Sequence, residues 1–196
     1  MSHHIYTTPG IIIGSRNSGE ANKYLYIFTR DLGMIGASAQ GIRLGKSKLK
    51  YHSQDFCYSS FSLVKGKDIW RVTSAGNGDT LFNEIKKYKS CFVIYVTILS
   101  LLKRLLNGEE KHEALFDEII NGFHFVISQS FDEKNLKSFE QIIVLRILHM
   151  LGYIGKVKEL ESFLKNEWNM EILAKSFEFK RKIVWEINRA LKESML

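Results

Sequence analysis

The chain has 196 residues, enough for one domain of ordinary size or two small ones. Apolar residues make up 45% and charged residues 25%, a balance that is typical of a folded protein and excludes a disordered one. The formal net charge of +7 predicts a polyanionic partner. Charge alone leaves nucleic acid and an anionic membrane surface both open.

Cellular location is indicated by three features of the sequence. The longest apolar run, Cys91 to Leu102, is too short to cross a bilayer and predicts a buried helix. His3, His4 and the turn that follows lack the basic-then-apolar pattern of a secretory signal. Cys57 and Cys91 form no CxxC pair, so neither a disulfide framework nor a structural zinc site is expected. We therefore expect a cytoplasmic protein.

The first part of the chain, from Gly10 to about Ala75, has frequent glycines and short runs of β-branched and aromatic residues. Five runs have the length of strands: Ile11–Ile13, Tyr24–Thr29, Met34–Ala39, Phe56–Val64 and Asp68–Ser74. Five short strands at close spacing predict a small closed barrel. The OB-fold is one such barrel, and an SH3-like barrel would give a similar pattern.

Aromatic and aliphatic residues alternate in the second of these runs. Tyr24, Tyr26 and Phe28 therefore fall on one face of a strand, and Leu25 and Ile27 fall on the other. Tyr24 and Tyr26 are candidates for stacking on unpaired bases, although packing within the protein is the stronger explanation for aromatic residues here. We expect Phe28 to pack in the core or against the second domain.

After the turn at residues 75–78, the apolar residues recur with the period of helices. Asp79 is placed to cap the first helix. The expected helices cover residues 79–88, 90–106, 115–127, 136–151, 156–168 and 177–191. The predicted fold class is α+β in two parts: a small N-terminal β-barrel in residues 1–78, and an all-α helical domain in residues 79–196.

Charge divides at the same boundary. Residues 1–78 hold ten basic and four acidic residues, a net charge of +6, whereas residues 79–196 hold eighteen basic and seventeen acidic residues. The densest basic segment is the glycine-punctuated loop from Arg43 to Lys50. Its cations can displace counterions from phosphates and bind nucleic acid without regard to sequence. A loop of this kind can also serve only solubility, but the segregation of charge favours binding.

Patterns for catalysis or cofactor binding are scarce. Gly45-Lys46-Ser47 lacks the preceding glycine of a phosphate-binding loop, because that position is Gln40. His112 has no second His or Cys at ligand spacing, and the acidic residues around it suit the start of a helix. We expect no enzyme, cofactor or metal site. The charge pattern also permits an RNA-binding or ribosome-associated protein, while a metal-dependent nuclease would need converging carboxylates.

Three segments of the first half match a family signature in order and spacing. They are Gly19–Lys23, Phe28–Gly33 and Ala37–Lys48, and together they resemble the N-terminal signature of the bacterial RecO family of DNA repair and recombination mediators. A looser match is Leu145–Tyr153, which resembles the end of a helix in the family's helical domain.

The resemblance implies an OB-fold domain that binds single- and double-stranded DNA, followed by a helical domain that contacts partners. RecO proteins anneal complementary strands. With RecR they help load the RecA recombinase onto DNA coated by single-stranded DNA-binding protein. In many relatives, paired cysteines after the matched helix end hold zinc, but this chain continues Ile154-Gly155-Lys156, so zinc is not expected. The resemblance also implies a shortened helical domain.

Site residues follow from the loop and from the resemblance. The family's basic loop falls on Arg43, Lys46 and Lys48. Arg146 is the one candidate for binding the acidic tail of single-stranded DNA-binding protein, and a helix-surface arginine is the alternative. The full set of expected DNA-binding residues is Arg43, Lys46, Lys48, Lys50, Arg30, Arg16, Tyr24 and Tyr26.

Overall fold

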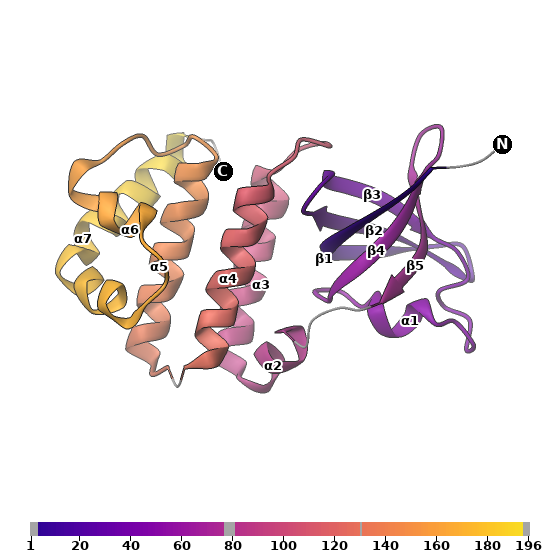
Figure 1. Cartoon of the computed structure of the whole chain (residues 1–196), viewed down its shortest axis with the longest axis horizontal. Coiled ribbons are helices and arrows are strands. Elements are labelled where there is room, and N and C mark those ends of the chain that lie inside the picture. The colour runs from indigo at the N-terminus through magenta and orange to yellow at the C-terminus, as the bar shows by residue number, and fades with distance from the viewer. Residues whose placement is uncertain (1–3, 77–80, 130, 194–196) are drawn as a thin grey trace. The chain divides into compact units, whose positions relative to one another are not determined.

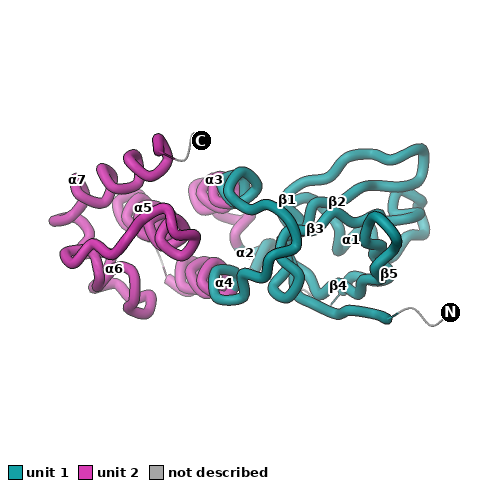
Figure 2. Tube along the Cα trace, turned by 90° about the horizontal axis from the view of Figure 1, so that it is seen from above, with its two compact units in different colours: residues 1–84, 99–116 teal, residues 85–98, 117–196 magenta. Residues whose placement is uncertain are grey.

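The computed structural model describes residues 4–76, 81–129 and 131–193 (Figure 1). The predicted helix cap Asp79 and the predicted domain boundary at residue 78 lie outside these residues, so both stay predictions. The chain divides into two compact units (Figure 2): residues 1–84 with 99–116, and residues 85–98 with 117–196.

The first unit contains a closed barrel of five strands in the order β1-β2-β3-β5-β4. All neighbouring strands are antiparallel except β3 and β5, which are parallel and pair only at Ala37–Trp70 and Ser38–Arg71. This topology, with the short helix α1 between β3 and β4, is that of the OB-fold and decides against the SH3-like alternative. The elements are β1 (Ile5–Ser18), β2 (Asn22–Thr29), β3 (Gly33–Ala39), α1 (Leu49–His52), β4 (Tyr58–Lys65) and β5 (Trp70–Gly76).

Strand β1 is much longer than the three residues predicted for it. Its first half pairs with β4 and its second half with β2, and the register shifts between Ile12 and Gly14. At Gly10, where both partners meet β1, an added Cβ would lie 2.9 Å from Ile27 and 3.2 Å from the ring of Phe61. Glycine is therefore required for close packing inside a strand, although in sequence it suggests a turn.

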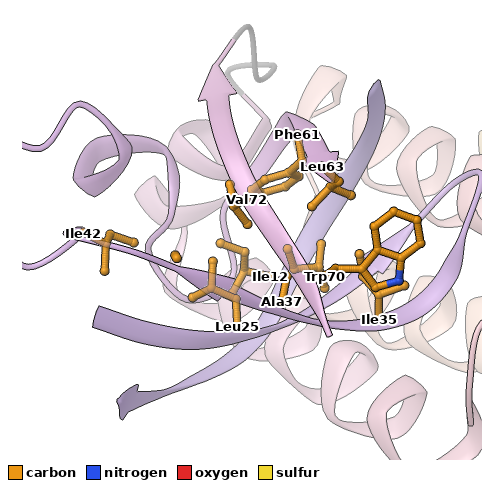
Figure 3. Close-up of a cluster of buried hydrophobic side chains, with 11 residues drawn as sticks. Ile12, Leu25, Ile35, Ala37, Ile42, Phe61, Leu63, Trp70 and Val72 are labelled. Carbon is orange, nitrogen blue, oxygen red and sulfur yellow. The ribbon is translucent and has the colours of Figure 1, made fainter. Parts of the chain in front are cut away.

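The barrel is filled by alternate residues of its strands (Figure 3). Leu25 and Ile27 are fully buried there, as their alternation predicts. Phe28, on the other face of β2, is also fully buried, and its ring lies 5.3 Å from that of Phe116. The complete cluster is Ile12, Leu25, Ile27, Ile35, Ala37, Ala39, Ile42, Phe61, Leu63, Trp70 and Val72.

The segment 106–112, which belongs to the same compact unit, packs on the barrel. Met34 donates its backbone N–H to the carbonyl of Gly108 at 3.1 Å. The carboxylate of Glu109 accepts a hydrogen bond from Trp70 Nε1 at 2.9 Å and from Lys65 Nζ at 2.8 Å. These bonds, first the one from Lys65 and then the one from Trp70, hold the pKa of Glu109 below its usual value.

The helices follow the apolar pattern, with one exception. None in the described part of the chain combines the length and apolar character needed to cross a bilayer. The continuous helix expected over 156–168 is wrong, because that segment forms only a 3₁₀ turn and a five-residue helix. The elements are α2 (Leu81–Lys87), α3 (Lys89–Leu105), α4 (Glu113–Ser128), α5 (Glu133–Met150), η1 (Lys158–Leu160), α6 (Glu161–Lys165) and α7 (Met170–Glu193).

Arg146 explains the interruption of that helix. Its guanidinium donates to the carbonyls of Phe163 and Asn166, both at 2.6 Å, and to the carboxylate of Glu118 at 2.7 Å. The side chain is 3% exposed and lies over the ring of Trp168. A position on the helix surface is therefore wrong for Arg146. The guanidinium satisfies carbonyls that a longer helix would have bonded internally.

Candidate nucleic-acid interface

The basic loop after β3 is a succession of tight turns. The backbone N–H groups of Leu44, Ser47 and Lys50 bond carbonyls three residues earlier, at Gly41, Leu44 and Ser47. Helix α1 follows at once and lies against β5. The basic side chains of the loop, Arg43, Lys46, Lys48 and Lys50, are all exposed.

These four cations carry no ion pair to any carboxylate in the part of the chain that the structure describes. Salt bridges within the described residues of the barrel involve other cations, such as Lys65 with Glu109 and Arg30 with Asp31. An exposed ammonium without a carboxylate is available to a phosphate oxygen. The loop therefore offers positive charge that the fold itself does not use.

A hollow of about 410 Å³ opens beside this loop, and we refer to it as the basic-loop pocket. Lys46 and Lys48 both line it, so the structure brings these two predicted residues together. Its lining contains no carboxylate. Tyr51, which was not among the predicted site residues, also lines it and is 74% exposed. The full lining is Gly45, Lys46, Ser47, Lys48, Tyr51, His52 and Ala75.

Arg43 lies apart from these lysines. Its guanidinium Nη1 donates to the carbonyl of Gly19 at 3.2 Å, and its backbone N–H donates to the carbonyl of Ala21 at 3.0 Å. Both acceptors belong to the turn between β1 and β2. Arg43 therefore joins the basic loop to that turn.

A second hollow, of about 420 Å³, lies between that turn and the connection from β4 to β5, and we refer to it as the β4–β5 pocket. The corresponding loops bind oligonucleotides in many OB-folds. Lys67 and Arg71 line the pocket, both exposed and, within the described residues, both without an ion pair; Asp68 lines it as well. The full lining is Ser18, Asn22, Ser38, Gln40, Val64, Lys65, Gly66, Lys67, Asp68, Ile69 and Arg71.

Lys67 and Arg71 were not among the predicted site residues. In sequence they contribute only to the charge of the first half. Their position depends on the parallel pairing of β5 with β3, which sets Arg71 opposite Ser38. The glycine-containing turn at Gly66, between two predicted strands, is the sequence signal that could have indicated them.

Arg16, Tyr24 and Tyr26 gather on the outer face of β1 and β2. The guanidinium of Arg16 lies over the ring of Tyr24, 4.8 Å from its centroid, and the ammonium of Lys103 lies 5.1 Å from that of Tyr26. The two tyrosine rings meet edge to face at 5.2 Å. Both rings therefore already have partners within the protein.

The two remaining candidates lie elsewhere. Arg30 follows the end of β2 that is opposite the β1–β2 turn, and it lies 3.6 Å from the carboxylate of Asp31. Arg146 is buried in the second unit, as described above.

Two further observations concern metal-ligating and nucleophilic side chains. Among residues 4–76, 81–129 and 131–193, no three His, Cys, Asp or Glu side chains come together in a group able to hold a metal ion. Burial raises the pKa of the Cys91 thiol to about 11, so this cysteine stays protonated at neutral pH.

Comparison with known proteins agrees with the fold and with the signature in the sequence. Residues 1–77 match the family model described as the N-terminal domain of recombination protein O. The chain is 31% identical over 157 residues to the DNA repair protein RecO of Dehalococcoides mccartyi, covering 80% of this chain and 60% of that protein. The RecO proteins of Clostridium perfringens and Acetivibrio thermocellus are 30% and 27% identical over 74% of this chain.

The chain spans about 57–60% of the length of these relatives. Its five-stranded OB-fold barrel coincides with the matched N-terminal domain. Residues 1–77 therefore correspond to the N-terminal domain of the RecO family, and most of the chain is similar to RecO proteins.

Proposed function

We propose that this protein binds single- and double-stranded DNA through its basic barrel and acts in DNA repair as a recombination mediator. The observation that carries the proposal is the set of cations in the basic loop that have no ion pair in the described chain. They stand on a barrel that matches the RecO N-terminal domain, and the matched relatives are named DNA repair proteins.

The mechanism that we infer is electrostatic. Lysines and arginines on the barrel replace condensed counterions along the phosphate backbone, so that binding is independent of sequence and weakens as salt rises. Two complementary strands held at such a surface repel each other less, which favours their annealing without ATP. The work of the protein is binding and positioning rather than catalysis, and its place is the cytoplasm, where the bacterial chromosome lies.

The test is charge reversal in the loop. In a variant with Arg43→Glu, Lys46→Glu and Lys48→Glu, we expect DNA affinity to fall sharply at low salt and annealing of complementary oligonucleotides to be lost. A matched control reverses the same number of exposed cations in the second unit: Lys137→Glu, Lys180→Glu and Lys192→Glu.

Equal affinity of the loop variant and the unaltered protein at two ionic strengths would contradict the proposal. Structured RNA that competes better than single-stranded DNA at equal salt would replace it with an RNA-binding function. Annealing of oligonucleotides coated with single-stranded DNA-binding protein distinguishes a mediator from a general DNA-binding protein.

Partner contacts form a further part of the proposal. RecR is expected to act with this protein in loading RecA. For single-stranded DNA-binding protein, the second unit offers a pocket of about 420 Å³. Its walls include Val126, Phe131 and Leu136, and Lys87 and Lys89 also line it. The lysines of this lining suit an acidic peptide tail, whose apolar side chains could pack on the apolar walls.

A fluorescently labelled peptide with the sequence of that acidic tail tests this site. We expect binding by anisotropy that Lys89→Glu weakens and that Lys180→Glu, an exposed lysine outside the pocket, leaves unchanged. Equal effects of the two substitutions would show that the peptide does not bind in this pocket.

A further inference from the structure

Tyr51 is the most exposed of the large apolar and aromatic side chains in the described part of the chain. It is the third residue of the four-residue helix α1, and it is 74% exposed. No hydrogen bond, ring contact or cation–π contact engages its side chain within the described residues. Its exposed ring, beside cations that have no ion pair among the described residues, is available to stack on a ligand.

The surroundings of Tyr51 define the chemistry of that ligand. Lys46 and Lys48 line the same pocket, together with the hydroxyl-bearing Ser47 and with His52. The pocket has no acidic residue in its lining, whereas the β4–β5 pocket includes Asp68. A ligand that fits here combines negative charge with a flat apolar face.

The two outer tyrosines of β2 differ in this respect. The ring of Tyr24 carries the guanidinium of Arg16, and that of Tyr26 carries the ammonium of Lys103. A base could stack on either ring only after displacing its cation. Tyr51 requires no such displacement.

We propose that the basic-loop pocket binds one unpaired nucleotide of a single DNA strand, with the base stacked on Tyr51 and the adjoining phosphates on Lys46 and Lys48. The inference rests on the proposed DNA binding and adds to it a preference for unpaired bases. Because a base within a duplex is stacked on both sides by its neighbours, Tyr51 contributes to binding single strands and not to binding duplexes.

The experiment compares three ligands of equal length at one salt concentration: a single strand, the corresponding duplex, and a single strand in which abasic sugars replace the nucleosides. For Tyr51→Ala, we expect affinity for the single strand to fall about five- to 150-fold, the loss that stacking on one base explains. Affinity for the duplex and for the abasic strand should stay within about twofold of the unaltered protein. Tyr51→Phe keeps the ring and should bind the single strand as before.

Tyr88→Ala is the matched control, because Tyr88 is a 61% exposed tyrosine of the second unit. It should change none of the three affinities. A second readout is a strand with one 2-aminopurine, whose fluorescence should be quenched on binding by the unaltered protein and by Tyr51→Phe, and not by Tyr51→Ala. Equal thermal unfolding midpoints of the variants verify the fold.

Two results overturn the inference: no loss with Tyr51→Ala, or an equal loss for all three ligands. The variant with Lys46→Glu and Lys48→Glu separates this failure from failure of the proposed function. If it weakens binding to all three ligands while Tyr51→Ala has no effect, the proposed DNA binding is supported and only the stacking site at Tyr51 is contradicted. If it leaves all three affinities unchanged, the proposed function itself falls.

Discussion

A single absent side chain determines how Tyr24 lies on the barrel. A Cβ added at Gly36 would meet the hydroxyl oxygen of Tyr24 at 1.8 Å and its ring carbon Cζ at 2.5 Å. The ring can therefore rest on β3 only because residue 36 is glycine. On its other side, Arg16 covers the ring. The cation–aromatic face of β1 and β2 depends on this close approach.

Gly36→Ala should destabilise the protein by about 1–3 kcal/mol, because Tyr24 must leave its place or the strands must shift. Urea unfolding measures the change. Gly155→Ala is the control, since nothing lies within 4 Å of a Cβ at Gly155, and it should stay within about 0.5 kcal/mol. Adding Tyr24→Ala to Gly36→Ala should cost less than the sum of the two single changes. Strict additivity would show that the two residues do not interact.

Glu109 gives the barrel a dependence on acid. Hydrogen bonds from Lys65 and Trp70 lower the pKa of Glu109. Its carboxylate therefore binds a proton more weakly in the folded protein than in the unfolded protein. The stabilisation is fully present above the pKa of about 4.3 that glutamate has in the unfolded protein. It is lost as pH falls through the lower pKa of Glu109 in the folded protein. The side chain is 48% exposed, so solvent screens part of the effect.

We therefore expect the difference in unfolding free energy between the unaltered protein and Glu109→Gln to be larger at pH 6 than at pH 3. Glutamine can still accept from Trp70, but it carries no charge for Lys65. Urea titrations of both proteins at the two pH values measure this difference, and other carboxylates cancel in the subtraction. A difference that does not change with pH would exclude Glu109 as the source.

At the scale of elements, the alternation and periodicity of apolar residues predicted the strands and helices better than the positions of glycines did. The alternation in residues 24–28 correctly placed Leu25 and Ile27 in the barrel, because strand geometry alone decides which residues share a face. The expected strand Ile11–Ile13 ended at Gly10 and Gly14, yet β1 runs through both: Gly10 allows close packing, and the register shifts between Ile12 and Gly14 within one long strand. Such a function of glycine depends on neighbouring strands that local sequence does not identify.

The interrupted helix after α5 shows the same limit. Residues 156–168 have an apolar pattern compatible with a helix, but Arg146 bonds the carbonyls of Phe163 and Asn166. These partners are 17 and 20 residues from Arg146 in sequence. The periodicity of apolar residues cannot predict a contact between residues so far apart in sequence. Because arginines are rarely buried, a position on the helix surface was the natural expectation for Arg146.

Arg146→Met should destabilise the protein by about 3–5 kcal/mol, because it leaves buried carbonyls and Glu118 without a donor. Arg146→Lys should recover little, since an ammonium cannot reproduce the planar fork that reaches three acceptors. Thermal and urea unfolding measure both. The control is Lys137→Met, an exposed change on α5 that should stay within about 0.5 kcal/mol. Recovery of full stability by lysine would mean that charge alone matters.

At the scale of the whole molecule, charge segregation indicated the barrel as the candidate interface, but it could not group the cations. Lys46 and Lys48 share a pocket, Arg43 lies on the β1–β2 turn, and Arg30 has Asp31 beside it. Tyr51, Lys67 and Arg71 were missed for a related reason. Exposure and the pairing of β3 with β5 decide their place, and neither can be read from composition.

The salt dependence of DNA binding separates these cations. Lys46→Gln and Lys48→Gln should each lower the slope of log affinity against log salt by about 0.7 for single strands and about 0.9 for duplexes. Arg30→Gln should lower it less, because Asp31 already neutralises part of its charge. Affinities measured across a series of salt concentrations give the slopes. An equal change for Arg30→Gln would place Arg30 at a phosphate.

The division of the chain into two compact units determines which segments should be exchanged when chimeric proteins are made from this chain and its relatives. The five strands of the barrel lie within residues 1–77, but the compact unit also includes residues 99–116, which pack on the barrel through Gly108, Glu109 and Phe116. A hybrid gene joined at residue 77 would set Met34, Trp70 and Phe28 of one species against foreign counterparts. Chimeras that transplant the barrel between species should therefore carry residues 1–84 and 99–116 as a set, as two inserts exchanged together.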